Sequence, residues 1–365
     1  MDLLAIFPDL EPIPQDDGPN SLATIAYPPV YADSMAYLRA LLVKDERSPR
    51  ALELTRQIIG INASHYTVWL YRARILFALG DGEAEERAQG KPLGEGEVSF
   101  ADYLREEIKW LNGIALNSLK NYQIWHHRQT IVTRLSKEDS GYRADGEIEF
   151  LARMLALDAK NYHVWSYRQW MIRYFSLWES TEEWKEIERF ITEDVRNNSV
   201  WNHRFFVTFA KYEDGLGKKS AEMRQKEDQE REEVLEREVK YAKDAILLAV
   251  NNQSPWSYLT GVLQRYGRPL SELKGFCEDL APIREEGRIR SSPALEILGD
   301  VYAESADADG AEKVYDLLST TFDPIRQPYW AWKKSRLRPA QSSSSDQPTI
   351  PRGREPPRTV AQPVS

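Results

Sequence analysis

Residues Lys120–Arg128 read K-N-Y-Q-I-W-H-H-R, and residues Lys160–Arg168 read K-N-Y-H-V-W-S-Y-R. The two blocks share an Asn, a Trp four positions later and an Arg three positions after the Trp. Two looser and two degenerate copies of this motif also occur, at His65–Arg72, Asn197–Arg204, Asn252–Leu259 and Ile325–Trp332. Such self-similarity is typical of proteins built from repeated structural units.

The spacing of the motif tryptophans indicates the length of the unit. Trp125 and Trp165 lie 40 residues apart, and Trp165 and Trp201 lie 36 residues apart. The intervals from Trp69 to Trp125 and from Trp201 to Trp256 are longer, at 56 and 55 residues. The unit is therefore about 36–40 residues long, and each long interval holds an insertion.

Each long interval contains one polar segment of about the excess length. Residues Gly80–Gly96 are dominated by Gly and Glu, which predicts a loop. Residues Asp214–Glu233 are rich in charge. They predict either a solvated loop or the exposed beginning of a long helix that becomes apolar at Val239–Leu248.

Apolar residues between the motifs recur with helical spacing, as Leu104, Ile108, Leu111 and Ala115 do at i, i+4, i+7 and i+11. Outside the motif copies, helices are expected at Tyr31–Val43, Leu52–Ile61, Tyr103–Leu116, Leu270–Leu280, Ala294–Ala303 and Ala311–Phe322. Each unit is then a helix, a short loop and a second helix, and no strand-like alternation competes with this pattern. We therefore predict an all-α solenoid of about six to seven helical hairpins.

The two ends of the chain differ from the repeats. Residues 1–30 are rich in Pro and Asp and lack periodicity, so they predict an extended arm that either packs on other parts or is partly disordered. The repeat domain is expected to span residues 31–337. Residues 338–365 include Ser342–Ser345 and several prolines, and they predict a disordered tail without a core.

The composition excludes several classes of function. Charged residues make up 29% of the 365 residues, and the net charge is −9. Because nucleic-acid-binding surfaces usually carry a basic excess, no nucleic-acid partner is expected. A single cysteine, Cys277, allows neither a disulfide framework nor a cysteine-based metal cluster. No run reaches the roughly 18–20 apolar residues of a transmembrane segment and no signal peptide is evident, so a cytoplasmic location is expected.

The residues shared by the motif copies have a structural explanation. Asn121 can cap the N-terminus of a helix, and Trp125 and Arg128 then share one face of that helix. The Trp can fill the seam between neighbouring hairpins, while the Arg can hydrogen-bond buried carbonyl groups at the turn of the adjacent unit. The same structural roles are expected for the equivalent residues Trp69, Trp165, Arg168, Trp201, Arg204 and Trp256.

The residues around the capping Asn have two interpretations. Lys120 and Tyr122 flank Asn121, and Lys160 and Tyr162 flank the equivalent Asn161. A helix N-terminus already favours an anion, and an added lysine and phenol would make a cradle for a phosphate or diphosphate. Alternatively, the two lysines are solvated side chains at the beginning of a helix.

The histidines and the missing motifs limit the chemistry of this chain. All five histidines (His65, His126, His127, His163 and His203) lie inside motif copies. They lack the spacing of metal ligands, so no metal site is expected, and most should pack or form hydrogen bonds. His163 is the one candidate for substrate contact. Because no Ser/His/Asp signature, P-loop or G-x-G-x-x-G occurs, this chain alone does not resemble a complete enzyme.

Longer stretches resemble the α subunits shared by protein farnesyltransferase and protein geranylgeranyltransferase type I. The resemblance covers about residues 10–337. Besides the two K-N-Y blocks, it is carried by PIPQDDGPN at Pro12–Asn20, VKDERSPRALELTR at Val43–Arg56, EDVRNNSVWNHRFF at Glu193–Phe206, VLEREVKYA at Val234–Ala242 and DPIRQPYW at Asp323–Trp330. The resemblance implies a right-handed α-α superhelix, shaped as a crescent that wraps around a β subunit.

The resemblance also implies partners, cofactors and site residues. The β subunit should hold zinc and most of the isoprenoid pocket, magnesium should act in the assembled enzyme, and this chain should bind no cofactor. The substrates should be farnesyl or geranylgeranyl diphosphate and proteins that end in a CaaX motif. The implied catalytic residues are Lys120 and Tyr122, and the implied substrate-binding residues are these two with Gln123, Asn161, Tyr162 and His163.

The implied roles have a chemical basis. As the cysteine thiolate attacks C1 of the isoprenoid, negative charge grows on the departing diphosphate. A fixed Lys120 ammonium there would stabilise the transition state more than the ground state. Gln123 should contact the C-terminal end of the acceptor peptide.

The first motif copy departs from the family pattern. It has His65 where the family usually has Asn, and Leu70 and Ala73 where His and Arg are common. Two alternatives remain open at this point. One is the α subunit of Rab geranylgeranyltransferase, and the other is a TPR-like scaffold that binds peptides without catalysis.

Overall fold

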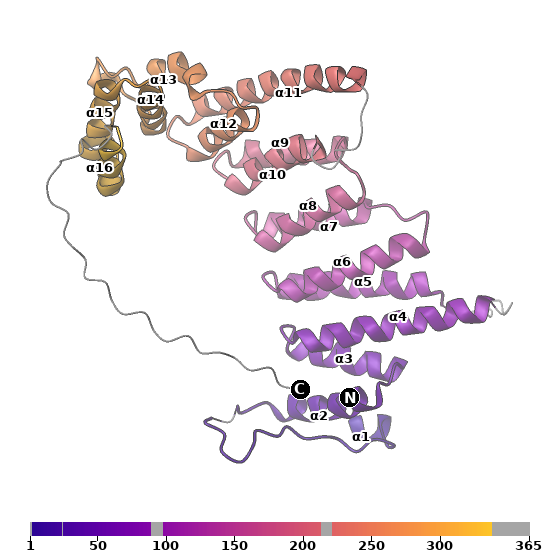
Figure 1. Ribbon diagram of the computed structural model, residues 1–365. Helices are drawn as coiled ribbons and strands as arrows, with labels where there is room; N and C mark the ends of the chain where they lie inside the picture. Colours follow the sequence, from indigo (N-terminus) through magenta and orange to yellow (C-terminus); the bar gives the residue numbers. More distant parts are fainter. Residues whose placement is uncertain (1, 24, 89–97, 213–220, 338–365) are drawn as a thin grey trace, which may run out of the picture. The chain divides into compact units, whose positions relative to one another are not determined.

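The structure is a computed structural model that describes residues 2–23, 25–88, 98–212 and 221–337 (Figure 1). Every regular element of these residues is helical. The described residues divide into two compact units: those up to residue 245 with 253–262, and those from 246–252 with 263–337. The repeats of the first unit position the candidate site.

Helical hairpins make up most of the first unit. Each pairs a first helix with a second helix that carries the motif: α3 (Pro49–Ile61) with α4 (Tyr66–Ala88), α5 (Phe100–Asn117) with α6 (Tyr122–Glu138), α7 (Asp145–Leu157) with α8 (Tyr162–Tyr174), α9 (Thr181–Glu193) with α10 (Asn198–Phe209), and α11 (Ala221–Leu248) with α12 (Gln253–Arg265). The motif helices α4, α6, α8 and α10 pack against one another in succession. The predicted all-α fold of repeated hairpins is confirmed.

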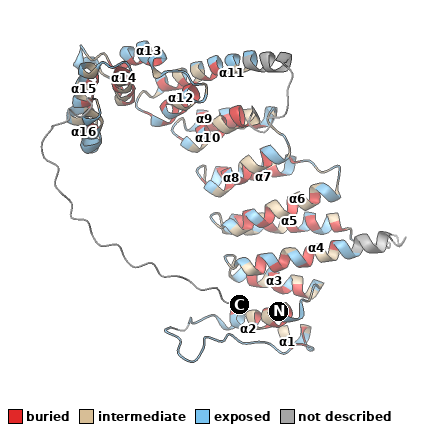
Figure 2. Ribbon diagram, viewed as in Figure 1, coloured by how far each residue is buried: buried red, intermediate tan, exposed pale blue. Residues whose placement is uncertain are grey.

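The burial pattern explains why these segments are helical. Buried and exposed residues alternate around α5 to α10 in Figure 2, as expected for amphipathic helices. All five motif tryptophans are buried, and four of them contact aromatic rings from both helices of the next hairpin. The pairs are Trp69 with Trp110 and His127, Trp125 with Phe150 and Tyr167, Trp165 with Phe190 and His203, and Trp201 with Tyr241 and Tyr258. The predicted packing of Trp in the seam is confirmed.

The motif arginines differ from the prediction. They bind buried carboxylates of the next hairpin rather than mainly buried carbonyl groups. The nitrogen–oxygen distances are 2.5 Å for Arg72–Glu107, 2.7 Å for Arg128–Glu147, 2.8 Å for Arg168–Glu183 and 2.7 Å for Arg204–Glu238. A guanidinium buried in a seam needs a full counter-charge, which a carbonyl group does not supply. Arg72 alone of the four also donates to a backbone carbonyl, that of Leu52.

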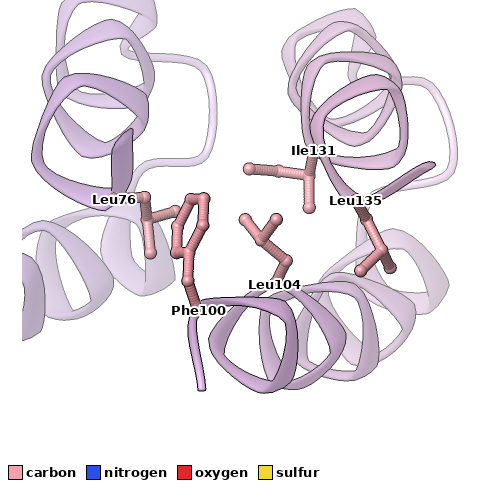
Figure 3. Packing of buried hydrophobic residues seen from close by; sticks show 5 residues of the cluster. All are labelled: Leu76, Phe100, Leu104, Ile131 and Leu135. Carbon is pink, nitrogen blue, oxygen red and sulfur yellow. The ribbon is translucent and has the colours of Figure 1, made fainter. Parts of the chain in front are cut away.

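The first polar insertion is helical where the structure describes it. Helix α4 continues to Ala88, so the predicted loop at Gly80–Gly96 is wrong for residues 80–88, and residues 89–96 lie outside the described residues. Figure 3 shows the packing just before the insertion. Phe100 and Leu104 of α5 pack beside Leu76 of α4 and against Ile131 and Leu135 of α6, which holds α4 against α5 where the loop was predicted to begin. At Gly80, a Cβ atom would come within 2.4 Å of the Phe100 ring.

The N-terminal arm packs on the first helices of the unit. It contains the short helix α1 (Leu3–Ile6) and leads into α2 (Pro29–Lys44), two residues before the expected beginning. Phe7 and Leu10 are buried, and the Arg50 guanidinium lies 2.6 Å from the Asp9 carboxylate. The beginning of the arm therefore packs on the first helices through Phe7, Asp9 and Leu10, whereas the described residues 11–30 are exposed.

The second unit contains shorter helices. These are η2 (Leu270–Leu273), α13 (Lys274–Leu280), η3 (Glu286–Arg288), α14 (Ser292–Glu304), α15 (Ala308–Leu317), η4 (Leu318–Phe322), η5 (Pro324–Arg326) and α16 (Gln327–Ser335). The helix expected at Leu270–Leu280 begins with a 3₁₀ turn, and the one expected at Ala311–Phe322 changes to a π-helical turn after Leu317. Helices α14 and α15 pack closely, because a Cβ at Gly299 would lie 2.6 Å from the Tyr315 ring.

The remaining predictions concern the second insertion and the tail. Helix α11 begins at Ala221, so the long-helix alternative for Asp214–Glu233 holds from that residue onward. Residues 214–220 and the tail at residues 338–365 lie outside the described residues.

Candidate functional site

The capping asparagines tie the turns of neighbouring hairpins together. Each accepts a hydrogen bond from the first turn of its own helix and donates its amide to the turn of the preceding hairpin. The donated bonds run from Asn121 to the carbonyl of Ala63 at 2.9 Å, from Asn161 to Leu119 at 2.9 Å and from Asn197 to Ala159 at 3.0 Å. The accepted bonds come from Ile124, from His163 and Val164, and from Ser199. The predicted capping role is confirmed.

These bonds bring the two K-N-Y blocks together. Leu119, which accepts the amide of Asn161, directly precedes Lys120. The beginning of α8 therefore lies against the turn that carries Lys120. Asn161 is itself only 3% exposed, and both ends of its amide are engaged, so it holds the two turns in place.

The two lysines differ in their surroundings. Both side chains are exposed. The ammonium of Lys160 lies 3.8 Å from the Asp194 carboxylate, whereas the described residues offer Lys120 no hydrogen bond or ion pair. Lys120 is therefore the lysine of the pair whose charge is not already matched by a carboxylate.

Two phenols and an imidazole lie beside the lysines. Tyr122 and Tyr162 are 60% and 76% exposed. The ring of Tyr162 meets the His163 ring edge-on at 5.7 Å between centroids. These side chains leave their polar atoms open to a ligand at the same turns.

Gln123 follows Tyr122 in the first turn of α6. Its amide nitrogen donates to the carbonyl of Ser64 at 2.9 Å, in the turn before α4. Together with Tyr122 it lines a pocket of about 300 Å³ between α4 and α6, whose other lining residues are Tyr66, Trp69, Leu70, Ala73, His126, His127 and Thr130. Gln123 is thereby held at the mouth of a largely apolar pocket, close to the Lys120 turn.

The turn before α6 also differs in one internal bond. Trp69, Trp165 and Trp201 each donate the indole N–H to the carbonyl six residues earlier. The indole nitrogen of Trp125 is buried but has no partner among the described residues. The turn that carries Lys120 is thus held by one hydrogen bond fewer than its counterparts.

Four buried glutamates support the site from within, and the sequence reading missed them. Each is bound by the Arg of the preceding motif and by a His or Tyr of the following one. The second contacts are His127 with Glu107 at 2.8 Å, Tyr167 with Glu147 at 2.7 Å, His203 with Glu183 at 2.6 Å and Tyr258 with Glu238 at 2.7 Å. In all four cases the Glu precedes its partner by 20 residues, a constant spacing that could have revealed them.

Burial and ion pairing set the ionisation of these groups. Burial alone would raise the pKa of Glu107, but the Arg72 guanidinium and His127 lower the pKa to about 2. The pKa of Glu183 is likewise lowered to about 2, against the effect of burial, by Arg168 and His203. Burial lowers the pKa of His127 and His203 despite their glutamate partners. At neutral pH the carboxylates are therefore charged and the two imidazoles neutral.

The described side chains of this site are of types that can bind an anion. An unpaired lysine, exposed phenols and helix N-termini favour an anionic ligand. Among the described residues, no group of three or more His, Cys, Asp or Glu side chains is arranged to hold a metal ion. No described helix combines the length and the apolar character needed to span a membrane.

Known proteins resemble the chain over most of its length. Residues 48–79, 104–135, 144–175, 180–210 and 235–266 match the family model described as protein prenyltransferase alpha subunit repeat. The protein farnesyltransferase/geranylgeranyltransferase type-1 subunit alpha of Schizosaccharomyces pombe is 37% identical, over 90% of this chain and 94% of that protein. A solved structure of Candida albicans protein geranylgeranyltransferase-I complexed with GGPP matches with a TM-score of 0.75 and 32% identity, over 91% of this chain and 98% of that chain.

A second type of α subunit matches less well. The geranylgeranyl transferase type-2 subunit alpha of Bos taurus is 26% identical over 60% of this chain and 35% of that protein. The type-1 match is higher in identity and extends over nearly all of both chains, as does the structural match. The chain therefore belongs to the family of protein farnesyltransferase/geranylgeranyltransferase type-1 alpha subunits.

Proposed function

We propose that this chain is the α subunit of a heterodimeric protein prenyltransferase. With a β subunit, it transfers a farnesyl or geranylgeranyl group from the diphosphate to the cysteine thiol of proteins that end in a CaaX motif. Family membership supports the reaction class. The cytoplasm is the compartment in which we propose that it acts.

One observation of the site carries this proposal. The unpaired Lys120 ammonium stands at the beginning of α6, next to the turn of the second K-N-Y block. A cation at this position can meet the diphosphate as the C1–O bond breaks and negative charge develops on the departing oxygen, and it would stabilise the transition state more than the ground state. Lys120 and the neighbouring phenol of Tyr122 are the proposed catalytic residues.

The other proposed site residues bind substrate or hold the turns. Tyr162 and His163 are accessible beside Lys120 and would contact the prenyl donor. Gln123 would contact the C-terminal end of the peptide, because its amide retains a second N–H beyond the one given to Ser64. Asn161 belongs to this set through the turn that it fixes.

We propose that the metals of the reaction are held outside this chain, as the family resemblance implies. Zinc is assigned to the β subunit on that ground. Magnesium is proposed for the assembled enzyme only. No chemical step is derived through either ion.

Co-expression with the candidate β subunits of the same genome tests the proposal. The purified complex should transfer farnesyl or geranylgeranyl to a CaaX peptide, whereas the peptide with Cys replaced by Ser should remain unmodified. Transfer by neither donor, or the absence of any stable heterodimer, would contradict the proposal. Peptide binding without transfer would instead favour a scaffold.

A further inference from the structure

The turn before α6 lacks a main-chain hydrogen bond that three equivalent turns contain. In those turns, a side-chain oxygen of Asn or Asp accepts from the main-chain N–H two residues later. The bonds run from Ser64 to Asn62 at 3.1 Å, from Lys160 to Asp158 at 3.2 Å and from Arg196 to Asp194 at 2.9 Å. The equivalent position before α6 is Ser118, and the described residues offer the N–H of Lys120 no acceptor. Lys120 therefore combines an unbonded main-chain N–H with its unpaired ammonium group.

The path of the chain is similar in all four turns. The φ angle is −142° at Asn62, −141° at Ser118, −144° at Asp158 and −145° at Asp194, and ψ is 55° at Ser118 and 86° to 90° at the other three. In each turn the carbonyl of this residue accepts from the N–H three residues later. A serine hydroxyl accepts from the N–H two residues later more weakly than Asn or Asp does. The side chain at position 118 therefore leaves the N–H of Lys120 without an acceptor.

The cap of α6 leaves a second main-chain donor unbonded. The capping asparagines of α8 and α10 accept from the second residue of each helix, which is His163 in α8 and Ser199 in α10. Asn121 accepts from Ile124 alone, so the N–H of Gln123, the second residue of α6, has no acceptor among the described residues. Two main-chain donors are thus free at the beginning of α6 that are bonded at the beginnings of α8 and α10.

A buried side chain adds a third donor at this turn. Trp125 is 5% exposed, and its indole N–H has no partner within the described part of the chain. In the three equivalent turns, the indole N–H donates to the carbonyl just before the position of Lys120. The beginning of α6 thus has more donors than acceptors, and a cation stands beside them. A surplus of N–H groups at a helix N-terminus favours an anionic ligand with several acceptor oxygens.

We propose that Ser118 is a positioning residue for the prenyl donor, because it supplies no acceptor and so leaves the main-chain N–H of Lys120 to an oxygen of the diphosphate. This inference rests on the proposed function. A hydrogen bond to a charged oxygen is stronger than one between neutral groups. In the turn before α8, Asp158 already accepts from the N–H of Lys160 and adds a negative charge. Ser118 therefore distinguishes the first K-N-Y block from the second as the main-chain donor to the diphosphate.

Asparagine at position 118 tests this role. Ser118→Asn should form the turn that Asn62 forms and bond the N–H of Lys120 without adding charge. The purified heterodimer with the β subunit is titrated with farnesyl diphosphate and with geranylgeranyl diphosphate. Ser118→Asn should weaken binding of the donor that the wild type transfers about tenfold, the lower end of the range for one hydrogen bond to a charged group. The KM for the CaaX peptide and the thermal unfolding temperature should stay at their wild-type values, whereas damage to the fold would change both.

Two further variants at this position separate the acceptor from other effects. Ser118→Asp should weaken donor binding more than Ser118→Asn, because its carboxylate also repels the diphosphate. It also covers the case in which Ser118→Asn does not fold, since Asp158 and Asp194 fit the same turn. Ser118→Ala supplies no acceptor and should bind the donor about tenfold more tightly than Ser118→Asn. The matched control is Ser180→Asn at the cap of α9, where asparagine caps as well as serine, and it should bind the donor as the wild type does.

The outcomes distinguish this inference from the proposed function. A wild-type chain that forms no heterodimer, or a heterodimer that transfers no prenyl group, would overturn both together. A wild-type heterodimer that transfers prenyl groups, with donor affinity unchanged in Ser118→Asn and Ser118→Asp, would overturn the role of Ser118 alone. Equal losses of affinity in Ser118→Ala and Ser118→Asn would assign the effect to the lost hydroxyl group and would also overturn it.

Discussion

At the scale of single residues, the same motif serves different purposes in different repeats. Asn121 and Asn161 perform the same capping and bridging, yet the lysines before them differ, since Lys160 is near Asp194 and Lys120 is unpaired among the described residues. Asp158 stands at the position equivalent to Asp194, three residues before the capping Asn, yet among the described residues no ion pair joins it to Lys120. The electrostatic surroundings, and not the motif itself, therefore single out Lys120.

A buried arginine offers a test at this scale. Nη1 of Arg128 donates to Asn112, five residues after Glu107, and Nη1 of Arg204 donates to Glu188, five residues after Glu183. By the same pattern, the acceptor for Arg168 would stand five residues after Glu147, and that position is occupied by Ala152.

Nη1 of Arg168 is buried without a partner among the described residues. Ala152→Asn should supply the missing acceptor and stabilise the protein by roughly 0.5–1.5 kcal/mol, the net value of one hydrogen bond. Urea unfolding measures the change. Ala152→Leu, which adds volume without an acceptor, is the control, and equal stability of the two variants would contradict this account.

At the scale of helices, the buried glutamates connect each hairpin to the next. Glu147 is bound by Arg128 from α6 and by Tyr167 from α8. Removing the carboxylate would leave the Arg128 charge buried and unpaired, because its other acceptor among the described residues, Asn112, is neutral.

Glu147→Gln should therefore destabilise the protein by about 3–5 kcal/mol, the cost of breaking a buried ion pair. Glu149→Gln, at an exposed position of the same helix, should change stability by less than about 0.5 kcal/mol. Chemical unfolding monitored by circular dichroism compares the two variants. Similar losses in both would show that the buried pair is not what joins the hairpins.

Two glycines of α4 give a matched pair of variants. Gly80 lies against the Phe100 ring, whereas a Cβ at Gly82 meets no atom within 4 Å. Alanine is favoured over glycine in a helix by up to about 1 kcal/mol. Gly82→Ala should raise the thermal unfolding temperature, and Gly80→Ala should lower it because the ring must move. A rise in both would mean that Phe100 does not pack as described.

At the scale of the whole molecule, the buried ionisable groups make stability depend on pH. The lowered pKa values of His127 and His203 mean that the unfolded chain takes up protons before the folded one as the pH falls. Stability should therefore begin to decline below about pH 6.5, the usual pKa of histidine. The pKa values of Glu107 and Glu183, lowered to about 2 from the usual 4.5 of a glutamate, add a steeper loss between about pH 4.5 and pH 2.

The thermal unfolding temperature measured from pH 8 to pH 3 should follow this two-stage course. His203→Tyr copies the tyrosine found at the equivalent position 167. It should flatten the first decline, because tyrosine does not titrate there, and leave the decline below pH 4.5. A first stage unaffected by this variant would exclude His203 as its source.

Much of the fold could be predicted from the sequence because the repeat is strongly periodic. The Asn–Trp–Arg spacing located the motif helices, their caps and the seam tryptophans. The loop predicted at Gly80–Gly96 was wrong up to Ala88 because glycine and glutamate indicate local preference, whereas packing of Phe100 against Gly80 extends the helix. The arm could not be placed, since its anchors are contacts such as Asp9 with Arg50 that lie far apart in sequence.

The candidate site was predictable only in part. The K-N-Y blocks and Gln123 stand out in the sequence, and the capping bonds explain why they meet. The glutamate partners of the arginines were missed because the insertions vary the distance from Arg to Glu, from 15 residues for Arg168 to 35 for Arg72. The pocket beside Gln123 depends on side chains from two hairpins, and no local pattern reveals it.

The single-turnover rate of prenyl transfer by the purified heterodimer tests the central claim most directly. Lys120→Ala should lower this rate roughly 10²-fold, the usual loss for one preorganised charge contact, with little change in the KM for the peptide. Lys109→Ala, at a lysine that is 76% exposed on α5, is the control and should retain the wild-type rate. An unchanged rate in Lys120→Ala would show that Lys120 is a solvated lysine and contradict the account.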